Sequence, residues 1–220
     1  MWFDNRTIQE QLWPATLETL YTTFFATLFT VIIGLAVGVA VVATSPRGLA
    51  PSPWLNRLLG VIINVGRSIP YIILAILLIP LTRVVVGNAI GWPAAVFSLT
   101  LAAIPFFARL VETNLLQVDS GKIEAARMMG ATRTRIMFDV VVREALPALV
   151  QSATVLVITL ISYGAMAGAI GGGGLGQLAM NHGYQRYQID VMVITVVVIV
   201  LIVQAVQMSG DMLSRLVDHR

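Results

Sequence analysis

Long apolar runs limit what this chain can fold into more than any other feature of its sequence. A helix needs about 20 apolar residues to cross the hydrocarbon core of a bilayer. Five segments supply them, at roughly residues 17–43, 58–81, 92–111, 147–169 and 191–208. Only 11% of the residues are charged, whereas an average soluble domain carries about 25%. The sequence therefore predicts an all-α integral membrane protein with five transmembrane helices.

The basic residues indicate how these helices are oriented, because short cytoplasmic loops are enriched in Lys and Arg. One set of alternate connections, with the C-terminal tail, holds Arg47, Arg57, Arg109, Lys122, Arg127, Arg133, Arg135, Arg143, Arg215 and Arg220. The other set, with the N-terminal tail, holds only Arg6, Arg83 and Arg186. We therefore predict an extracytoplasmic tail over 1–16, a membrane domain over 17–211 with a cytoplasmic loop over about 112–146, and a cytoplasmic tail over 212–220.

Several kinds of site are not expected on this chain. It contains no GxxxxGK[ST] loop that could bind ATP phosphates. Gly171, Gly173 and Gly176 match GxGxxG, but they follow an apolar segment and not the strand that a dinucleotide site needs. Cysteine is absent, and His182 and His219 lie far apart, so we expect surface histidines and no metal site. The sequence has no basic stripe interleaved with aromatic residues, so nucleic acid is not an expected partner either. We also predict no catalytic residue and no cofactor bound by this chain.

The loop over about 112–146 is too long for a simple reversal between neighbouring helices, for which about 2–8 residues suffice. Asp119 and Ser120 can cap a helix start with their side-chain oxygens. Gly130 suits the left-handed position just beyond a helix end. These signals predict a short helix over about 121–129, lying across the cytoplasmic face. A solvated amphipathic surface loop is the alternative interpretation.

The motif inside this helix resembles the EAA loop of the membrane subunits of bacterial ABC importers. It reads Glu124-Ala125-Ala126, followed after three residues by Gly130. In that family the loop forms a coupling helix that docks on the ATP-hydrolysing subunit. The resemblance therefore implies an ATPase-coupling role for Glu124, Ala125, Ala126, Arg127 and Gly130. The chain departs from the family pattern at residues 140–143, where Val-Val-Val-Arg replaces Ile-x-Leu-Pro, and Leu-Pro follows only at 146–147.

Three longer strings are similar to the methionine-uptake branch of that family: NVGRSIPYIILAILLIPLTRVVVG, IPFFARLVETNLL and GAIGGGGLGQLAMNHGY. The resemblance implies a permease subunit in the bacterial inner membrane, which forms a homodimeric pathway for D- and/or L-methionine and works by alternating access. It also implies two ABC ATPase subunits that hold ATP and Mg, an extracytoplasmic substrate-binding protein, and surrounding lipid. The alternatives are another small amino acid or methionine derivative as cargo, an ion-coupled secondary transporter, or a membrane assembly protein without transport activity.

Polar and helix-breaking residues in or beside the apolar segments are candidates for the translocation pathway, since a polar group facing lipid is costly. These candidates are Arg67, Ser68, Pro70, Ser162, Tyr163 and Met166. If the second helix begins near Leu58, Arg67 lies about 15 Å along it. If that helix begins near Ile69, Arg67 reaches the cytoplasmic interface instead. Pro70 is expected to kink the helix.

Glycines repeat every four residues in two of the segments, a spacing that lets membrane helices approach closely. The repeats are Gly34 and Gly38 in the first segment, and Gly164, Gly168, Gly172 and Gly176 in and after the fourth. For the first pair we expect plain helix packing. For the second group we expect packing near the pathway.

Overall fold

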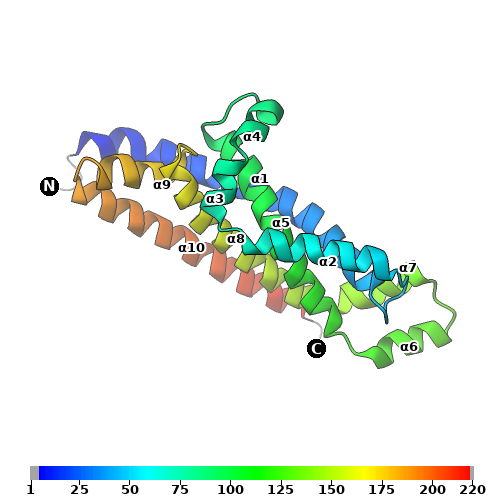
Figure 1. The fold of residues 1–220 in the computed structure, drawn as a ribbon. Coiled ribbons are helices and arrows are strands. Elements are labelled where there is room, and N and C mark those ends of the chain that lie inside the picture. The colour runs from blue at the N-terminus through cyan, green and yellow to red at the C-terminus, as the bar shows by residue number, and fades with distance from the viewer. Residues whose placement is uncertain (1–4, 219–220) are drawn as a thin grey trace. The chain divides into compact units, whose positions relative to one another are not determined.

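The computed structural model describes residues 5–218. Residues 1–4 and 219–220, and with them His219 and Arg220, lie outside the described part. All regular structure in the described residues is helical, as the sequence predicts. The elements labelled in Figure 1, with two π-helices named η2 and η3, are α1 (Arg6–Thr44), α2 (Pro53–Ser68), α3 (Tyr71–Leu77), α4 (Ile79–Val86), α5 (Trp92–Leu116), α6 (Ser120–Met128), α7 (Arg133–Arg135), η2 (Ile136–Val142), α8 (Leu146–Ala169), α9 (Gly174–Leu178), η3 (Ala179–Tyr184) and α10 (Ile189–Val217).

Among the described residues, four helices are long and apolar enough to cross a membrane by themselves: α1, α5, α8 and α10. A fifth candidate is the interrupted pair of α2 and α3. The predicted segment 147–169 coincides with α8 to within one residue. The number of spans stays a prediction, because a fifth span requires α2 and α3, which bend by 103° at their break, to count as one.

Helix α1 begins earlier than the predicted boundary at residue 17. It starts at Arg6, because Asn5 caps it: the Asn5 side-chain oxygen accepts a hydrogen bond from the backbone N–H of Thr7 at 2.9 Å. Pro14 lies inside the helix without ending it. The described part of the predicted N-terminal tail is therefore mostly helical and continuous with the first apolar segment.

The second apolar segment is not one helix. Helix α2 ends at Ser68, and Pro70 stands immediately before α3 with an extended ψ of 135°. A proline ring disfavours the helical conformation of the residue before it, here Ile69, and removes a backbone donor. Where the sequence predicts a kink at Pro70, the structure has a complete break.

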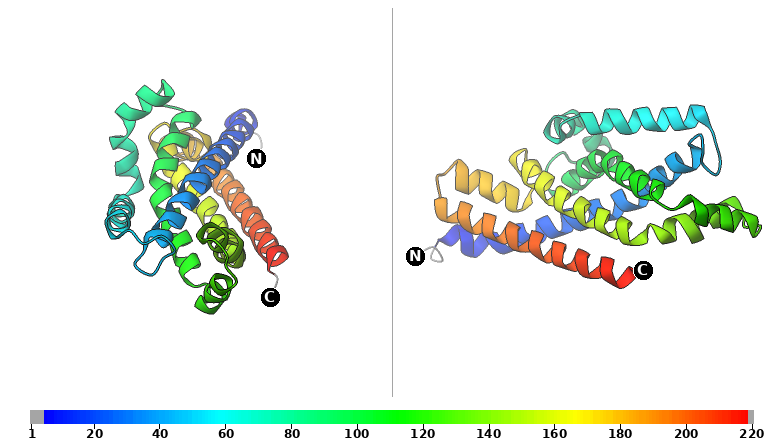
Figure 2. Two further views of the ribbon diagram at one scale, coloured as in Figure 1. Left: turned by 90° about the vertical axis from the view of Figure 1, so that its right-hand side faces the viewer. Right: turned by 90° about the horizontal axis from the view of Figure 1, so that it is seen from below.

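The chain divides into two compact units. The first unit consists of the described residues of Met1–Phe29, Ile69–Ala103 and Leu156–Met208. Part of its core joins the start of α1, α9 and the start of α10, which run beside one another in Figure 2. The buried side chains of this cluster are Ile8, Ala15, Leu175, Leu178 and Val191.

The second unit consists of Thr30–Ser68, Ile104–Val155 and the described residues of Ser209–Arg220. Here α1 packs closely on α5, because a Cβ added at Gly38 would lie only 2.6 Å from the Cβ of Val111. A Cβ at Gly34 would lie 3.0 Å from the ring of Phe107. The plain packing interpretation of these two glycines is confirmed.

Helices α8 and α10 meet in the same unit at another glycine. A Cβ added at Gly210 would collide with the side chain of Thr154. Nearby, the Ser214 hydroxyl donates to the carbonyl oxygen of Pro147 at 3.2 Å. These contacts fix the end of α10 against the beginning of α8.

Candidate coupling surface and transport pathway

The short helix predicted in the charged loop is present as α6, and both of its ends are closed by caps. At the start, the Asp119 carboxylate accepts from the backbone N–H two residues on, at 2.8 Å. At the end, Gly130 has a φ of +79°, its N–H donates to Arg127 O at 3.0 Å, and the N–H of Ala131 donates to Ala126 O at 3.1 Å. This pair of bonds is the Schellman motif, which satisfies carbonyls that a helix end leaves unpaired.

Four of the five coupling candidates are exposed on this helix: Glu124, Ala125, Arg127 and Gly130. The fifth, Ala126, is only 5% exposed. It lies on the side where α6 packs against η2. The side chain of Ala126 therefore packs within the loop itself, and its role in ATPase coupling stays a prediction.

Two neighbouring methionines extend the exposed surface and were missed by the sequence reasoning. Met128 is 89% exposed and Met129 is 82% exposed. Methionine side chains are flexible and polarizable, so they adapt readily to a partner surface. Their position directly before the capping glycine is the signal that could have identified them. We define the coupling surface as Glu124, Ala125, Arg127, Met128, Met129 and Gly130.

An ion pair ties α6 to the chain that leads into α8. The Nζ of Lys122 lies 2.5 Å from a carboxylate oxygen of Glu144. Both side chains are at least partly exposed, so the pair adds little to stability. The pair instead helps to orient α6 relative to the segment that leads into α8, because it joins residues that are 22 positions apart in the sequence.

The departure from the family pattern at residues 140–143 falls at a π-helix. Element η2 buries Ile136, Met137 and Val141. Single turns of π-helix often occur at functional sites. Pro147 then stands in the first turn of α8. Proline is tolerated there because backbone N–H groups of a first turn have no partner within the helix. The change of direction after α6 is therefore built without Leu-Pro at the family position.

Of the pathway candidates on α8, Tyr163 faces neighbouring helices of its own unit. Its ring stacks on that of Tyr71, with centroids 5.0 Å apart and planes at 4°. The Tyr71 hydroxyl lies 3.3 Å from the hydroxyl of Ser98. Since Pro70 immediately precedes Tyr71, this stack fixes the start of α3 against α8.

Ser162 and Met166 lie on an exposed side of α8, one turn apart. Met166 is 50% exposed. The Ser162 hydroxyl donates to the carbonyl of Ile158 at 3.2 Å, so its hydrogen bond remains within the helix. These two residues are exposed, whereas Tyr163 is half-buried.

Arg67 and Ser68 end α2, and both side chains are exposed. Helix α2 begins at Pro53 and a second helix, α3, begins at Tyr71, so Arg67 lies at the end of one helix and just before the start of the next. The depth of Arg67 in the membrane stays a prediction. A basic side chain in a last helical turn interacts favourably with the helix dipole. The Ser68 hydroxyl donates to the carbonyl of Asn64 at 2.8 Å.

The glycine repeat after Ser162 serves mainly a contact between backbones. A Cβ at Gly176 would lie 2.5 Å from the backbone of Ala165, and one at Gly168 would collide with Gln177. Helices α8 and α9 therefore pack with almost no side chain between them. At Gly164 a Cβ would meet nothing within 4 Å, so this position faces open space.

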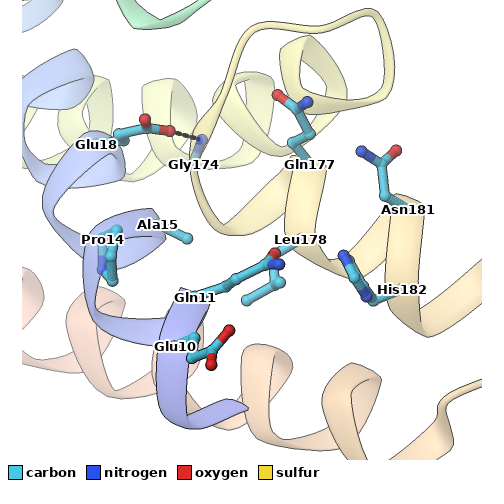
Figure 3. Close-up of a pocket in the computed structure, with 10 residues that line it drawn as sticks. All are labelled: Glu10, Gln11, Pro14, Ala15, Glu18, Gly174, Gln177, Leu178, Asn181 and His182. Carbon is cyan, nitrogen blue, oxygen red and sulfur yellow. Dashed lines mark hydrogen bonds between the residues drawn. The ribbon is translucent and has the colours of Figure 1, made fainter. Parts of the chain in front are cut away.

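Sequence reasoning also missed a polar pocket of about 280 Å³ in the first unit, shown in Figure 3. Its lining residues are Glu10, Gln11, Pro14, Ala15, Glu18, Gly174, Gln177, Leu178, Asn181 and His182. His182 is only 8% exposed, so the expectation of a surface histidine is wrong at this position. The residue that could have revealed the pocket is Glu18, which is the only carboxylate in the apolar segment 17–43.

Glu18 has a structural task in this pocket. Its carboxylate accepts from the backbone N–H of Gly174 at 2.7 Å, and the next residue, Thr19, accepts from the N–H of Leu175 at 2.9 Å. Helix α1 thus satisfies the first backbone donors of α9, which would otherwise be unpaired. The described residues contain no group of three or more His, Cys, Asp or Glu side chains that could hold a metal ion.

Comparison with known proteins decides the family. Residues 32–220 match the family described as "Binding-protein-dependent transport system inner membrane component". The chain belongs to this family. The resemblance to ABC importer subunits is therefore confirmed, and a role in transport agrees with it. An ion-coupled transporter that works alone and a non-transporting assembly protein are both at odds with the family.

Relatives in this family match the chain over nearly its whole length. The "Probable D-methionine transport system permease protein MetI" of Vibrio cholerae is 46% identical, over 94% of this chain and 92% of that protein. The "Methionine import system permease protein MetP" of Bacillus subtilis is 45% identical, over 100% of this chain and 98% of that protein. Both relatives are named as permeases.

Solved structures share the fold. A chain of the MetNI methionine ABC transporter in an inward-facing conformation superposes with a TM-score of 0.95 at 44% identity, over 98% of this chain and 100% of that chain. A crystal structure of an amino acid ABC transporter with histidines gives a TM-score of 0.75 at 20% identity, over 93% of this chain and 92% of that chain. The second likeness concerns the fold alone.

Proposed function

We propose that this chain is the permease subunit of an ATP-driven importer that carries methionine across the cytoplasmic membrane. The observation that carries the proposal is the likeness over almost the full length to the MetI and MetP permeases and to the MetNI transporter. Another small amino acid or a methionine derivative is the alternative cargo. Stereochemistry, D or L, would be set by contacts in the pathway.

The assembly that we propose contains two copies of this chain, two ABC ATPase subunits, and a substrate-binding protein outside the cell. ATP and Mg bind to the ATPase subunits, and lipid surrounds the membrane domain. The coupling surface supports this arrangement, because α6 leaves four of its five motif residues open to a partner. Nucleic acid has no place in it.

The proposed topology has five spans, with α2 and α3 together as the second. The N-terminus lies outside and the C-terminus lies in the cytoplasm, with 17–211 as the membrane domain and 112–146 as the coupling loop. The excess of Arg and Lys in the loops assigned to the cytoplasm supports this orientation. Residues 112–146 are largely helical, which agrees with a coupling helix in this loop.

The proposed mechanism is alternating access. ATP binding closes the ATPase subunits on each other, α6 follows them, and η2 passes that movement to α8. The pathway would be lined by Arg67, Ser68, Pro70, Ser162, Tyr163 and Met166, with the Tyr163 ring also holding α3 against α8. The exposure of Ser162 and Met166 on one side of α8 supports this lining.

Uptake of labelled methionine into proteoliposomes tests the proposal. The vesicles contain this chain with its ATPase, the binding protein is added outside, and ATP is present or absent inside. We expect uptake that requires ATP and is competed by unlabelled methionine. ATP-dependent uptake of another amino acid alone would change the cargo, and uptake driven only by an ion gradient would overturn the proposal.

A further inference from the structure

Helix α2 runs alongside α5, as two successive contacts show. Ile63 is 2% exposed and packs with Ala108 of α5. Three residues later, Gly66 faces Pro105, three residues earlier in α5, and a Cβ at Gly66 would lie 2.6 Å from the Pro105 ring. The two helices are therefore antiparallel neighbours. Since α5 is long and apolar enough to span a membrane, its contact with α2 favours a place for this part of α2 within the same layer.

The remainder of α2 presents two exposed stripes of opposite chemistry. The apolar stripe consists of large hydrophobic side chains that are 41% to 74% exposed: Trp54, Leu58, Val61, Ile62 and Val65. The polar stripe consists of Gly60, which is half-buried, and four exposed residues: Arg57, Asn64, Arg67 and Ser68. Within each stripe the residues follow one another at helical spacing, so each stripe occupies one face. A helix that meets only lipid or only water on its free side would not separate its residues in this way.

The polar stripe has few partners of its own. The Asn64 side-chain amide makes no hydrogen bond within the described residues, although its backbone oxygen accepts from Ser68. A Cβ placed at Gly60 would meet nothing within 4 Å, so the stripe borders open space. A guanidinium or a carboxamide that faced hydrocarbon would be costly. The stripe therefore requires water or a polar ligand beside it.

We propose that the polar stripe of α2 lines the water-filled translocation pathway while the apolar stripe faces lipid, and that Asn64 contacts the charged end groups of an amino-acid substrate. A carboxamide offers donors to a carboxylate and an acceptor to an ammonium group. Arg67, one turn away, adds a fixed positive charge for the carboxylate. The inference rests on the proposed transport function and adds Arg57, Gly60 and Asn64 to the lining.

Single cysteines test this directly, since the chain contains none of its own. Asn64→Cys and Ser68→Cys report on the polar stripe, and Ile62→Cys is the matched control at nearly the same depth on the apolar stripe. Each variant is reconstituted with its ATPase and treated with a charged thiosulfonate reagent that cannot enter lipid. The rate of modification is measured without nucleotide and after trapping with ATP and vanadate. Ser68→Cys is nearly isosteric, so it preserves the test if Asn64→Cys fails to assemble.

We expect the polar-stripe cysteines to react at least about tenfold faster than Ile62→Cys, because only a hydrated thiol ionises to the reactive thiolate. We also expect their rate to change when ATP closes the pathway on one side. Equal slow rates on both stripes would overturn the inference. A difference in modification rate between the stripes that is the same with and without ATP and vanadate would also overturn the inference, because this result indicates a helix at the membrane surface.

The failure of this inference and the failure of the proposed function are separate results. If the wild-type complex does not take up methionine but the polar stripe is labelled in a nucleotide-dependent way, the cargo is wrong and the lining stands. If methionine uptake is intact but the stripes react alike, the lining is wrong and the function stands.

Discussion

At the scale of single residues, a substitution at Gly130 should impair ATPase coupling without impairing folding. Its φ of +79° disfavours side chains, and nothing lies within 4 Å of an added Cβ. Asp adds a negative charge at the C-terminal end of α6, where the helix dipole disfavours it by about 0.3–1 kcal/mol, whereas Asn tolerates the left-handed conformation without that charge. We expect Gly130→Asp to lose most ATPase co-purification and methionine uptake, with normal membrane insertion, and Gly130→Asn to lose much less. Wild-type behaviour of both variants would contradict docking at this surface. The sequence alone predicts the capping role of this glycine, because capping depends on local backbone conformation. It could not predict that Ala126 is buried, because that depends on packing against η2.

At the scale of elements, the spans could be predicted to within a few residues at α8, since a long apolar run follows directly from the thickness of a bilayer. The two π-helices could not be predicted, nor could the partner of each closely packed helix, because packing partners are distant in the sequence. The contact of α8 with α10 at Gly210 and Thr154 is the sharpest example. Any larger side chain at Gly210 must push these helices apart, so we expect Gly210→Leu to destabilise the protein by about 1–3 kcal/mol. Gly164→Leu is the matched control, since a Cβ there meets nothing within 4 Å. The temperature at which each purified variant loses its monodisperse peak measures the difference. Equal losses for the two variants would show that the α8–α10 contact is not tight.

At the scale of the whole molecule, the proposed orientation in the membrane rests on charge alone, and the proposed five spans would place the termini on opposite sides. The pocket of Figure 3 had only Glu18 as a signal in the sequence, and its partner Gly174 could not be predicted because the two residues are 156 positions apart. Helix α10 allows a test of orientation with two nearly equally exposed positions, Ile189 at 71% and Leu216 at 65%. Similar exposure means that a difference in labelling reports the side of the membrane and not burial. We expect Ile189→Cys to react with an impermeant thiol reagent in intact spheroplasts, and Leu216→Cys to react only after permeabilisation. Labelling of both in intact spheroplasts, or of Leu216→Cys alone, would refute the proposed orientation and with it the cytoplasmic location of the coupling surface.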